Sequence, residues 1–360
     1  MRMSRKMEHV EHALRIGQVG NQGLADIKFV HNCLPDASVD DIHLHTAIGD
    51  LDLSSPILIN AMTGGADETR SINRELAVAA RECGLAMAVG SQMSAIKNPE
   101  VASSYRVVRS VNPDGILIGN LGSEATVEQA LRAVEMIGAN ALQIHLNVMQ
   151  ELIMPEGDRS FKGALERIAD IASNVPVPVI VKEVGFGIMR ESAAKLIRLP
   201  IAAIDVGGTG GTNFAAIENA RRPQAYEWLN DWGNPTAIAL LESLSVWPRG
   251  RVIASGGIRN GLECAKALAL GASAAGIAGA ALRVLQTEGT AALIDYLRRI
   301  HEELRLVMTA LGAASIEELW NVPLVVSGES AEWCELRGID IRTYARRQWT
   351  ETGRARPSGD

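Results

Sequence analysis

The sequence predicts an α/β fold: a closed (β/α)₈ TIM barrel with an N-terminal extension and C-terminal helices. Three observations lead to this prediction. Short runs that are apolar at nearly every position recur from about residue 55 to 308, which is typical of strands covered on both faces of a parallel sheet. Helix-period segments separate these runs, as the crossovers between parallel strands require. The 360 residues, 47% of them hydrophobic, are sufficient for one such domain.

The apolar runs and the segments between them predict the barrel elements in order along the chain. The expected strands are Pro56–Thr63, Leu85–Gly90, Gly115–Asn120, Ala141–Asn147, Pro178–Val184, Ala203–Val206, Arg251–Ser255 and Ala274–Ala278. The expected helices are Ile72–Cys83, Thr126–Ile137, Ala164–Ala172, Glu191–Ile197, Thr236–Val246, Gly261–Leu270 and Ala291–Leu311. Gly84, Gly138 and Gly271 follow three of these helices, where glycine commonly ends a helix. A doubly wound open sheet is the alternative, and eight units with no early GxGxxG motif disfavour it.

The segments on either side of the barrel are expected to have different roles. Residues 1–54 are expected to form an arm and a strand pair that cover one end of the barrel, and residues 55–311 are expected to form the barrel itself. Residues 312–360 read as a C-terminal segment that is partly a flexible tail. The simplest interpretation of its basic residues is a solvated end of the chain. These residues are Arg342, Arg346, Arg347, Arg354 and Arg356.

Composition excludes several classes of protein. The net charge of −7 argues against nucleic acid as a partner. The four cysteines are scattered without CxxC spacing, which argues against a disulfide scaffold or a structural zinc site. No apolar stretch reaches the roughly 20 residues of a membrane span, and the first residues are too charged for a signal peptide. We therefore expect a cytoplasmic enzyme that binds neither nucleic acid nor membrane.

Nearly every expected strand ends in glycine or a polar residue, and TIM barrels place their chemistry at these ends. The sharpest signal is Ser255-Gly256-Gly257 followed one unit later by Ala278-Gly279. Glycines let backbone N–H groups approach an anion, and a helix N-terminus adds a favourable dipole. Because the loops after the seventh and eighth strands commonly bind phosphate, we expect a phosphate site here. Simple tight turns are the alternative.

Charged residues near the other strand ends admit both functional and structural interpretations. Lys182 ends a Val-Ile-Val strand, and three interpretations of it are open. It would stabilise negative charge on a cofactor, form a Schiff base, or form an ion pair with Glu183 or Asp205. Glu151 is either a Mg²⁺ ligand or a surface carboxylate. Arg5, Lys6 and His9 form an ordinary helix face unless the arm folds over the mouth, where they would hold a diphosphate. The sequence has no GxSxG, HExxH or P-loop motif.

The ordered motifs of the chain resemble those of a known family. They are RKMEH, NAMTGG, AVGSQ, GNLGS, ALQIHLNVMQE, VKEVGFG, GGTGGTNFAAIE and ASGGIRNGLECAKALALGA. Over about residues 4–335 the sequence is similar to the type 2 isopentenyl diphosphate isomerases, flavin-dependent barrel enzymes that interconvert isopentenyl and dimethylallyl diphosphate. The resemblance implies FMN, Mg²⁺ and a reductant such as NADPH, and a homotetramer or homo-octamer. It also implies that reduced FMN donates and accepts a proton with no net redox change.

The resemblance also assigns residues by position. FMN would be held by Met62, Thr63, Gly64, Ser91, Asn120, Lys182, Thr212, Gly256, Gly257, Ala278 and Gly279. The substrate would meet Arg5, Lys6, His9, Ser91, His145, Asn147 and Gln150. Glu151 would bind Mg²⁺, and the catalytic residues would be Gln150, His145 and Lys182, with Lys182 beside N1 of the anionic reduced flavin.

Two positions depart from the family pattern, and three other functions remain as alternatives. Met93 replaces an arginine of many members, so Lys97 is a candidate for the missing phosphate contact, and Phe214 replaces a tryptophan.

A flavin 2-hydroxy-acid oxidase would need His and Arg on the late loop that reads Gly207-Gly208-Thr209-Gly210-Gly211 here. An inosinate-type dehydrogenase would need a cysteine at a middle strand end. A flavin redox sensor would need no diphosphate residues.

Overall fold

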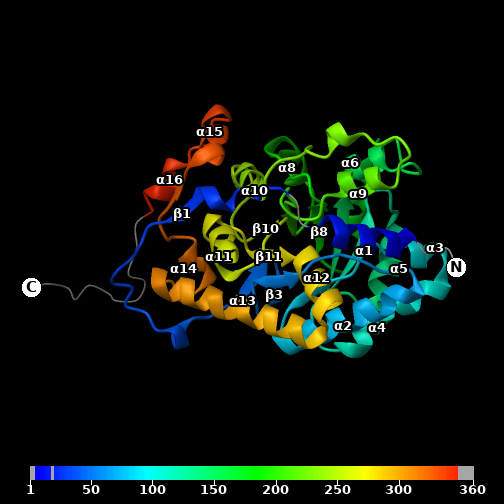
Figure 1. Cartoon of the computed structure of the whole chain (residues 1–360), viewed down its shortest axis with the longest axis horizontal. Coiled ribbons are helices and arrows are strands. Elements are labelled where there is room, and N and C mark those ends of the chain that lie inside the picture. The colour runs from blue at the N-terminus through cyan, green and yellow to red at the C-terminus, as the bar shows by residue number, and fades with distance from the viewer. Residues whose placement is uncertain (1–4, 18–19, 348–360) are drawn as a thin grey trace, which may run out of the picture.

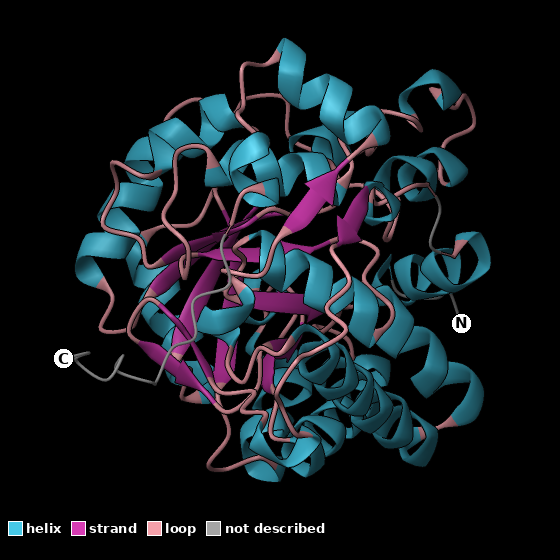
Figure 2. Ribbon diagram, turned by 90° about the vertical axis from the view of Figure 1, so that its left-hand side faces the viewer, coloured by secondary structure: helices cyan, strands magenta, loops and turns pink. Residues whose placement is uncertain are grey.

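Eight parallel strands close into a barrel at the centre of the molecule, and helices surround them (Figures 1 and 2). The computed structural model describes residues 5–17 and 20–347, apart from the side chains of Arg5, Lys6 and His9. The predicted fold class is confirmed. The barrel strands are β4 (Ile57–Ile59), β5 (Ala86–Ala88), β6 (Leu117–Gly122), β7 (Ala141–Leu146), β8 (Val179–Glu183), β9 (Ala203–Asp205), β10 (Val252–Ser255) and β11 (Ala274–Ile277).

Each strand neighbours the next in the chain, and the barrel closes where β11 pairs with β4 through Ala275 opposite Ile57. All eight predicted strands are present, but most are shorter than their apolar runs. Pro56–Thr63, for example, is a strand only over Ile57–Ile59, and the residues that follow leave the sheet at its carboxyl end. The apolar pattern extends beyond the ladder because buried loop residues are apolar too.

An outer ring of helices covers the barrel, and neighbouring helices of the ring pack on one another. Local signals start and stop them: Thr126 and Gln129 form a capping box at the start of α5, and Gly138 adopts φ 56° after its end. None of the described helices has the length and apolarity of a membrane span. The ring consists of α2 (Asp67–Cys83), α4 (Ser103–Val111), α5 (Val127–Ile137), α7 (Ala164–Asn174), α8 (Arg190–Leu196), α10 (Thr236–Leu244), α11 (Gly261–Leu270) and α13 (Thr290–Leu311).

Additional helices lie between strand ends and ring helices, and the sequence analysis did not predict them. They are too short for the hydrophobic period to repeat clearly, or they follow a strand end with no polar cap. Ala291–Leu311, expected as the first helix after the last strand, is observed as α13 and is preceded by one of them. They are α3 (Met93–Lys97), α6 (Val148–Ile153), α9 (Phe214–Ala220) and α12 (Gly279–Glu288). Helix α4 of the outer ring was not predicted either.

A hairpin of β2 (Thr46–Ile48) and β3 (Leu51–Leu53) plugs the amino end of the barrel. Ile48, Leu51 and Leu53 point inward and are buried, because residues alternate faces along a strand. They form one cluster with residues at the amino ends of the barrel strands, including Leu58 and Ile180. Within the part of the chain that the structure describes, the hairpin therefore covers this end, which leaves the carboxyl end of the barrel for a ligand.

Two short strands that lie far apart in the sequence pair outside the barrel sheet. Strand β1 (Ile27–Phe29) pairs antiparallel with β12 (Leu324–Val326), which lies between α14 (Ile316–Leu319) and α15 (Gly328–Leu336). Helix α16 (Arg342–Ala345) follows. The expectation of a solvated basic end is wrong at Arg347, which donates to the carbonyl oxygens of Ala269 (2.6 Å) and Val322 (3.2 Å). Burial lowers the pKa of Arg347 to about 10. Arg354 and Arg356 lie outside the described residues.

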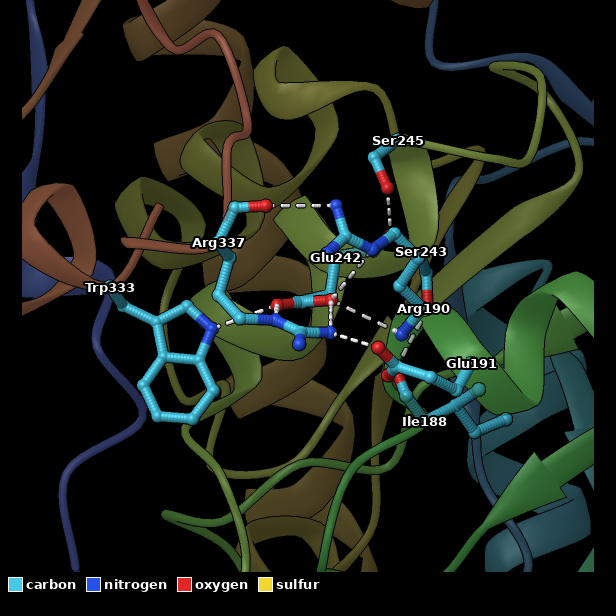
Figure 3. Close-up of polar contacts among 8 residues, drawn as sticks. All are labelled: Ile188, Arg190, Glu191, Glu242, Ser243, Ser245, Trp333 and Arg337. Carbon is cyan, nitrogen blue, oxygen red and sulfur yellow. Dashed lines mark hydrogen bonds and ion pairs between the residues drawn. The ribbon is translucent and has the colours of Figure 1, made fainter. Parts of the chain in front are cut away.

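A buried carboxylate attaches α15 to the barrel (Figure 3). Glu242 on α10 accepts hydrogen bonds from Nε of Arg337 (2.7 Å) and Nε1 of Trp333 (2.9 Å). It also accepts from the backbone N–H of Arg190 (3.3 Å), where the loop after β8 enters α8. Arg190 in turn donates to the carbonyl oxygen of Arg337 (3.0 Å). Helix α15 and the residue that follows it are therefore tied to the loop after β8.

Candidate active site

A cavity of about 440 Å³ opens at the carboxyl ends of the barrel strands. The loops after all eight strands contribute to its wall, as expected for a barrel whose loops carry the site. Predicted residues that line it are Met62, Thr63, Ser91, Asn120, His145, Asn147, Gln150, Glu151, Lys182, Thr212, Gly256, Gly257, Ala278 and Gly279. The fold therefore brings residues spread over more than 200 positions to one cavity.

Four predicted residues are placed differently or only in part. Gly64 lies behind the cavity wall with φ 149°, and a Cβ atom there would meet the Tyr105 ring at 2.1 Å. Arg5, Lys6 and His9 belong to helix α1 (Arg5–Ile16), but their side chains lie outside the described residues.

The loops after β10 and β11 form a cradle of backbone. Gly256 and Gly257 have φ of 109° and 78°, and a Cβ atom on them would meet the oxygens of Gly208 (2.1 Å) and Gly210 (2.3 Å). A side chain at either position is therefore excluded by both conformation and space. Helix α12 begins one loop further on, at Gly279, with its N-terminus at the cavity. Its free N–H groups and dipole favour an anion.

Lys182 and Glu183 place a cation and a carboxyl group side by side on the cavity wall. Lys182 is 6% exposed, and its Nζ donates to the carbonyl oxygen of Glu183 (2.6 Å). Oε2 of Glu183 accepts from the backbone N–H groups of Val184 (2.7 Å) and Phe186 (2.6 Å), which shapes the loop after β8. Burial raises the pKa of Glu183 to about 7, although these N–H groups and Lys182 oppose the rise.

Gln150 is held by a charged group that the sequence analysis did not select. Its Nε2 donates to Oε1 of Glu218 (2.9 Å), a fully buried residue of α9. Arg221 forms an ion pair with the other oxygen of Glu218 and with Glu156 (2.7 Å). Nε of Arg221 also lies 3.7 Å from the Glu8 carboxylate on α1. This contact connects the N-terminal helix to the side chain of Gln150.

Glu151 is an oxygen donor at the edge of the same cavity. Its Oε1 accepts from Nδ2 of Asn147 (2.9 Å), and its Oε2 accepts from the backbone N–H of Asp158 (2.8 Å). Within residues 5–17 and 20–347, no cluster of three His, Cys, Asp or Glu side chains is arranged to hold a metal. Any Mg²⁺ here would therefore need ligands from water or a bound phosphate, which is how Mg²⁺ usually binds.

Helix α1 lies over the mouth of its own barrel, beside α9 and α12 (Figure 1). Val10 and Ala13 of α1 line the cavity, as do Met154 and Leu282. These side chains form an apolar wall above the polar strand ends. Lys97, the suggested replacement for the arginine that Met93 lacks, also lines the cavity, as do Met93 and Phe214.

Two further residues carry information that the sequence pattern lacked. Thr63 lines the cavity, and its buried Oγ1 has no hydrogen-bond partner among residues 5–17 and 20–347, so its hydrogen-bonding capacity is left for a ligand. Tyr105 is fully buried on α4, and its hydroxyl group binds the carbonyl oxygen of Ser91 and lies 3.0 Å from Oγ of Ser94. It packs against Gly64 as well, and so holds two cavity loops together.

The features that the alternative functions need are missing from the described lining. All four cysteines lie in the described part of the chain, and none lines the cavity. Residues 207–211 contribute glycines to the wall, without the His and Arg of a hydroxy-acid oxidase loop. Of the lining residues whose side chains are described, His145 is the one histidine.

Comparison with known proteins identifies close relatives along nearly the whole chain. The sequence is 53% identical over 345 residues to an isopentenyl-diphosphate delta-isomerase of Geobacillus sp. (strain WCH70), covering 96% of this chain and 99% of the relative. It is 55% identical over 347 residues to the protein of the same name from Bacillus cytotoxicus, covering 96% and 99%. A Bacillus pumilus protein of that name is 53% identical, covering 96% and 97%.

More distant comparisons agree on the barrel. The family model described as FMN-dependent dehydrogenase matches residues 148–325. A mandelate oxidase variant with a monooxide FMN adduct superimposes with a TM-score of 0.60 at 17% identity, covering 90% of this chain and 93% of that one. A flavocytochrome b2 variant with sulfite bound gives a TM-score of 0.63 at 18% identity, covering 90% and 80%. These two similarities concern the fold alone.

Proposed function

This chain belongs to the isopentenyl-diphosphate delta-isomerase family, and from this premise we propose that it interconverts isopentenyl diphosphate and dimethylallyl diphosphate. The proposal includes reduced FMN, Mg²⁺ and NADPH as the reductant. The observation that carries it is the 53% identity over 96% of the chain. The cavity at the strand ends, where the motif residues converge, supports the same conclusion.

The cavity has groups that suit FMN. The Gly256-Gly257 turn and the N-terminus of α12 offer backbone N–H groups to a phosphate. The unpartnered Oγ1 of Thr63 can bind a polar edge of the ring system, and Lys182 offers a buried cation to an anionic ring. Reduced FMN, when bound, would add a proton to one carbon of the substrate and accept one from another, which shifts the double bond.

A second set of lining residues suits a diphosphate. His145, Asn147 and Gln150 offer neutral or cationic polar groups, and Ser91 offers a hydroxyl group. The arm residues Arg5, Lys6 and His9 are proposed to complete the anion site, on the basis of the family resemblance. Glu151 is proposed to bind Mg²⁺ together with substrate phosphate oxygens, since one carboxylate is enough when the substrate supplies further ligands.

The apolar wall suits the hydrocarbon end of the substrate. Val10, Ala13, Met154 and Leu282 would cover a five-carbon chain and exclude water from it. Excluding water matters because the reaction passes charge onto a carbon that water would otherwise attack. The side chains of this chain therefore bind, orient and shield the substrate.

An anaerobic proton-NMR assay tests the proposal. The purified protein receives FMN, NADPH, Mg²⁺ and isopentenyl diphosphate, and we expect dimethylallyl diphosphate to appear only when both FMN and reductant are present. We expect Gln150→Ala to lower turnover by about 10²-fold or more while FMN still binds, because a transition-state contact of this kind contributes a few kcal/mol. Gln286→Ala on the exposed face of α12 is the matched control.

Each result of this assay bears on the proposal. Conversion by the oxidised enzyme at the same rate without reductant would contradict the role of reduced FMN. A yellow, FMN-loaded protein without any conversion would contradict the isomerase activity and favour a hydroxy-acid oxidase or a redox sensor. In that case Met93→Arg would be the first variant to assay, since this position departs from the family pattern.

We further propose a homotetramer or homo-octamer in the cytoplasm, supported by the family resemblance. Light scattering after size-exclusion chromatography measures the mass against 38.5 kDa per chain. A monomer at micromolar concentration would contradict the proposed assembly.

A further inference from the structure

A chain of side-chain hydrogen bonds crosses the barrel interior below the cavity and ends at His145. It begins at Asp205 on β9, whose Oδ2 accepts from Nδ2 of Asn60 (2.6 Å). Oδ1 of Asn60 accepts from Nε2 of Gln143 (3.1 Å), and Oε1 of Gln143 accepts from Nδ2 of Asn120 (3.2 Å). Oδ1 of Asn120 lies 2.8 Å from Nδ1 of His145. Strands β6, β7 and β9 and the loop after β4 all contribute.

The direction of this chain is fixed at its first amide from two independent sides. The carboxylate of Asp205 can only accept, so the Asn60 atom facing it must be the NH₂ group. The backbone N–H of Ala61 can only donate, and it donates to the other atom of the same amide (2.9 Å), which must be the oxygen. The Asn60 amide therefore has one orientation.

Each later member inherits its direction from the one before. Gln143 must turn its NH₂ group to the Asn60 oxygen, so its own oxygen faces Asn120. Asn120 must turn its NH₂ group to that oxygen, so its Oδ1 faces His145. An amide oxygen can only accept, and Nδ1 of His145 must therefore carry a hydrogen.

Burial makes this direction costly to change. Gln143 and Asp205 are fully buried, and Asn60 and Asn120 are 3% and 2% exposed. A reversed amide would leave two donors or two acceptors facing each other without water, and each unsatisfied buried group costs about 1–3 kcal/mol. The backbone of Asn120 is also fixed, because its N–H donates to Oε1 of Gln92 (3.0 Å) and its carbonyl accepts from Gln92 N–H (2.8 Å).

We propose that Asp205, Asn60 and Gln143 are positioning residues that hold His145 in the tautomer protonated at Nδ1. Nε2 is then the nitrogen at which His145 gains or loses a proton and exchanges hydrogen bonds with a ligand. The use of His145 on the diphosphate substrate rests on the proposed function, whereas the tautomer does not. Asn60 and Gln143 lie in the quoted motifs but received no role there, and Asp205 was considered only as an ion-pair partner of Lys182, because the contacts of all three exist only in the closed barrel.

Nitrogen NMR of the ligand-free protein tests the tautomer directly. The protein is labelled with ¹⁵N-histidine, and His145→Asn identifies the signals of His145 among the seven histidines. We expect a protonated-nitrogen signal at Nδ1, and in the neutral ring an unprotonated signal at Nε2. An unprotonated Nδ1 in the neutral wild-type ring would overturn the proposal.

Gln143→Met is the informative variant, because it keeps the length of the side chain and removes both hydrogen bonds. Nδ2 of Asn120 then loses its acceptor, and the Asn120 amide can rotate and present NH₂ to His145. We expect the Nε2-protonated tautomer to gain population. Ser255→Ala is the matched control: it removes the hydroxyl that donates to Oδ1 of Asp205 and leaves the amides untouched, so the tautomer should not change.

Folding and function are separated by two further measurements. Gln143→Glu, in its protonated form, still donates to Asn60 and accepts from Asn120, so it should restore the wild-type tautomer. An unchanged tautomer in Gln143→Met with a normal circular dichroism spectrum would overturn the proposal. In the isomerase assay we expect the kcat of Gln143→Met to fall by between about tenfold and 10⁴-fold, with KM little changed. The upper figure is the loss that a wrong histidine tautomer causes in the serine-protease triad.

The two proposals can therefore fail separately. The expected tautomer in a protein without isomerase activity would leave the positioning role intact and contradict the proposed function. Isomerase activity in a protein whose neutral His145 is protonated at Nε2 alone would support the proposed function and contradict the positioning role.

Discussion

Lys182 illustrates how much a single buried residue reveals before a structure is known. A lysine at the end of an apolar strand indicates a function or a partner, and the structure places it on the cavity wall with 6% exposure. Of the partners considered, neither the Glu183 carboxylate nor Asp205 takes its hydrogen bond; the Glu183 backbone carbonyl does. A carbonyl does not neutralise an ammonium group, so the site favours an anion beside Nζ.

We expect Lys182→Met to weaken binding of reduced FMN by about 10- to 100-fold, since hydrogen bonds to charged groups contribute about 1.5–3 kcal/mol. Oxidised FMN carries no ring charge and should be affected less. Titrating the apoprotein with FMN in both redox states measures the difference. Lys195→Met, on the exposed side of α8, controls for the loss of one surface charge. Equal weakening in both redox states would contradict this role.

His301 gives the stability a definite dependence on pH. Burial and the nearby Arg305 charge lower the pKa of His301 to about 4, and Nε2 lies 2.7 Å from Oγ of Ser55. Below about pH 6.5, the usual histidine value, the unfolded chain binds a proton that the folded chain does not. The free energy of unfolding should therefore fall as the pH drops from 6.5 toward 4.

Urea titrations between pH 4 and 7 measure this contribution. His301→Gln should flatten the slope, whereas His43→Gln at an exposed position should leave it as in the wild type. If His301→Gln keeps the wild-type pH dependence of the free energy of unfolding, other groups cause that dependence.

At the scale of elements, the sequence located those with strong local signals and missed those that depend on neighbours. The eight barrel strands follow from apolar runs, and α11 was placed at Gly261–Leu270, as observed. Helix α9 was missed because its seven residues span only two turns, and its start depends on Asn213 accepting from the N–H of Ala216. Glu218 and Tyr105 were missed for a related reason: their roles arise from contacts with residues far along the chain.

The hairpin plug makes a prediction at the same scale. Ile48→Ala should lower the free energy of unfolding by about 2–5 kcal/mol, because a fully buried isoleucine leaves a cavity at the closed end of the barrel. Val39→Ala, at a position 41% exposed, should change it by less than about 0.5 kcal/mol. Urea unfolding followed by circular dichroism measures both. A loss at Ile48 no larger than at Val39 would mean that the hairpin packs loosely.

The whole molecule couples ligand binding to folding. Since loops after all eight strands line one cavity, the site exists only in the folded barrel, and a ligand that binds there stabilises the folded state. At a free FMN concentration a hundred times the dissociation constant, the free energy of unfolding should rise by about 2.7 kcal/mol. Thermal melts with and without FMN measure this. Riboflavin, which lacks the phosphate, should stabilise less if the Gly256-Gly257 cradle holds that group, and equal stabilisation would contradict the cradle.

The closure of the barrel has a consequence for synthesis on the ribosome. Strand β4 needs β11 as a neighbour, yet Ile57 and Ala275 are more than 200 residues apart in the chain. At a translation rate of about 5–20 residues per second, one edge of β4 stays unpaired for roughly 10 to 45 s after its synthesis. The pairing of β1 with β12 waits longer still. The nascent chain thus emerges as an open sheet with unprotected edges, a state prone to aggregation, and chaperone supply during translation should limit the yield of active protein.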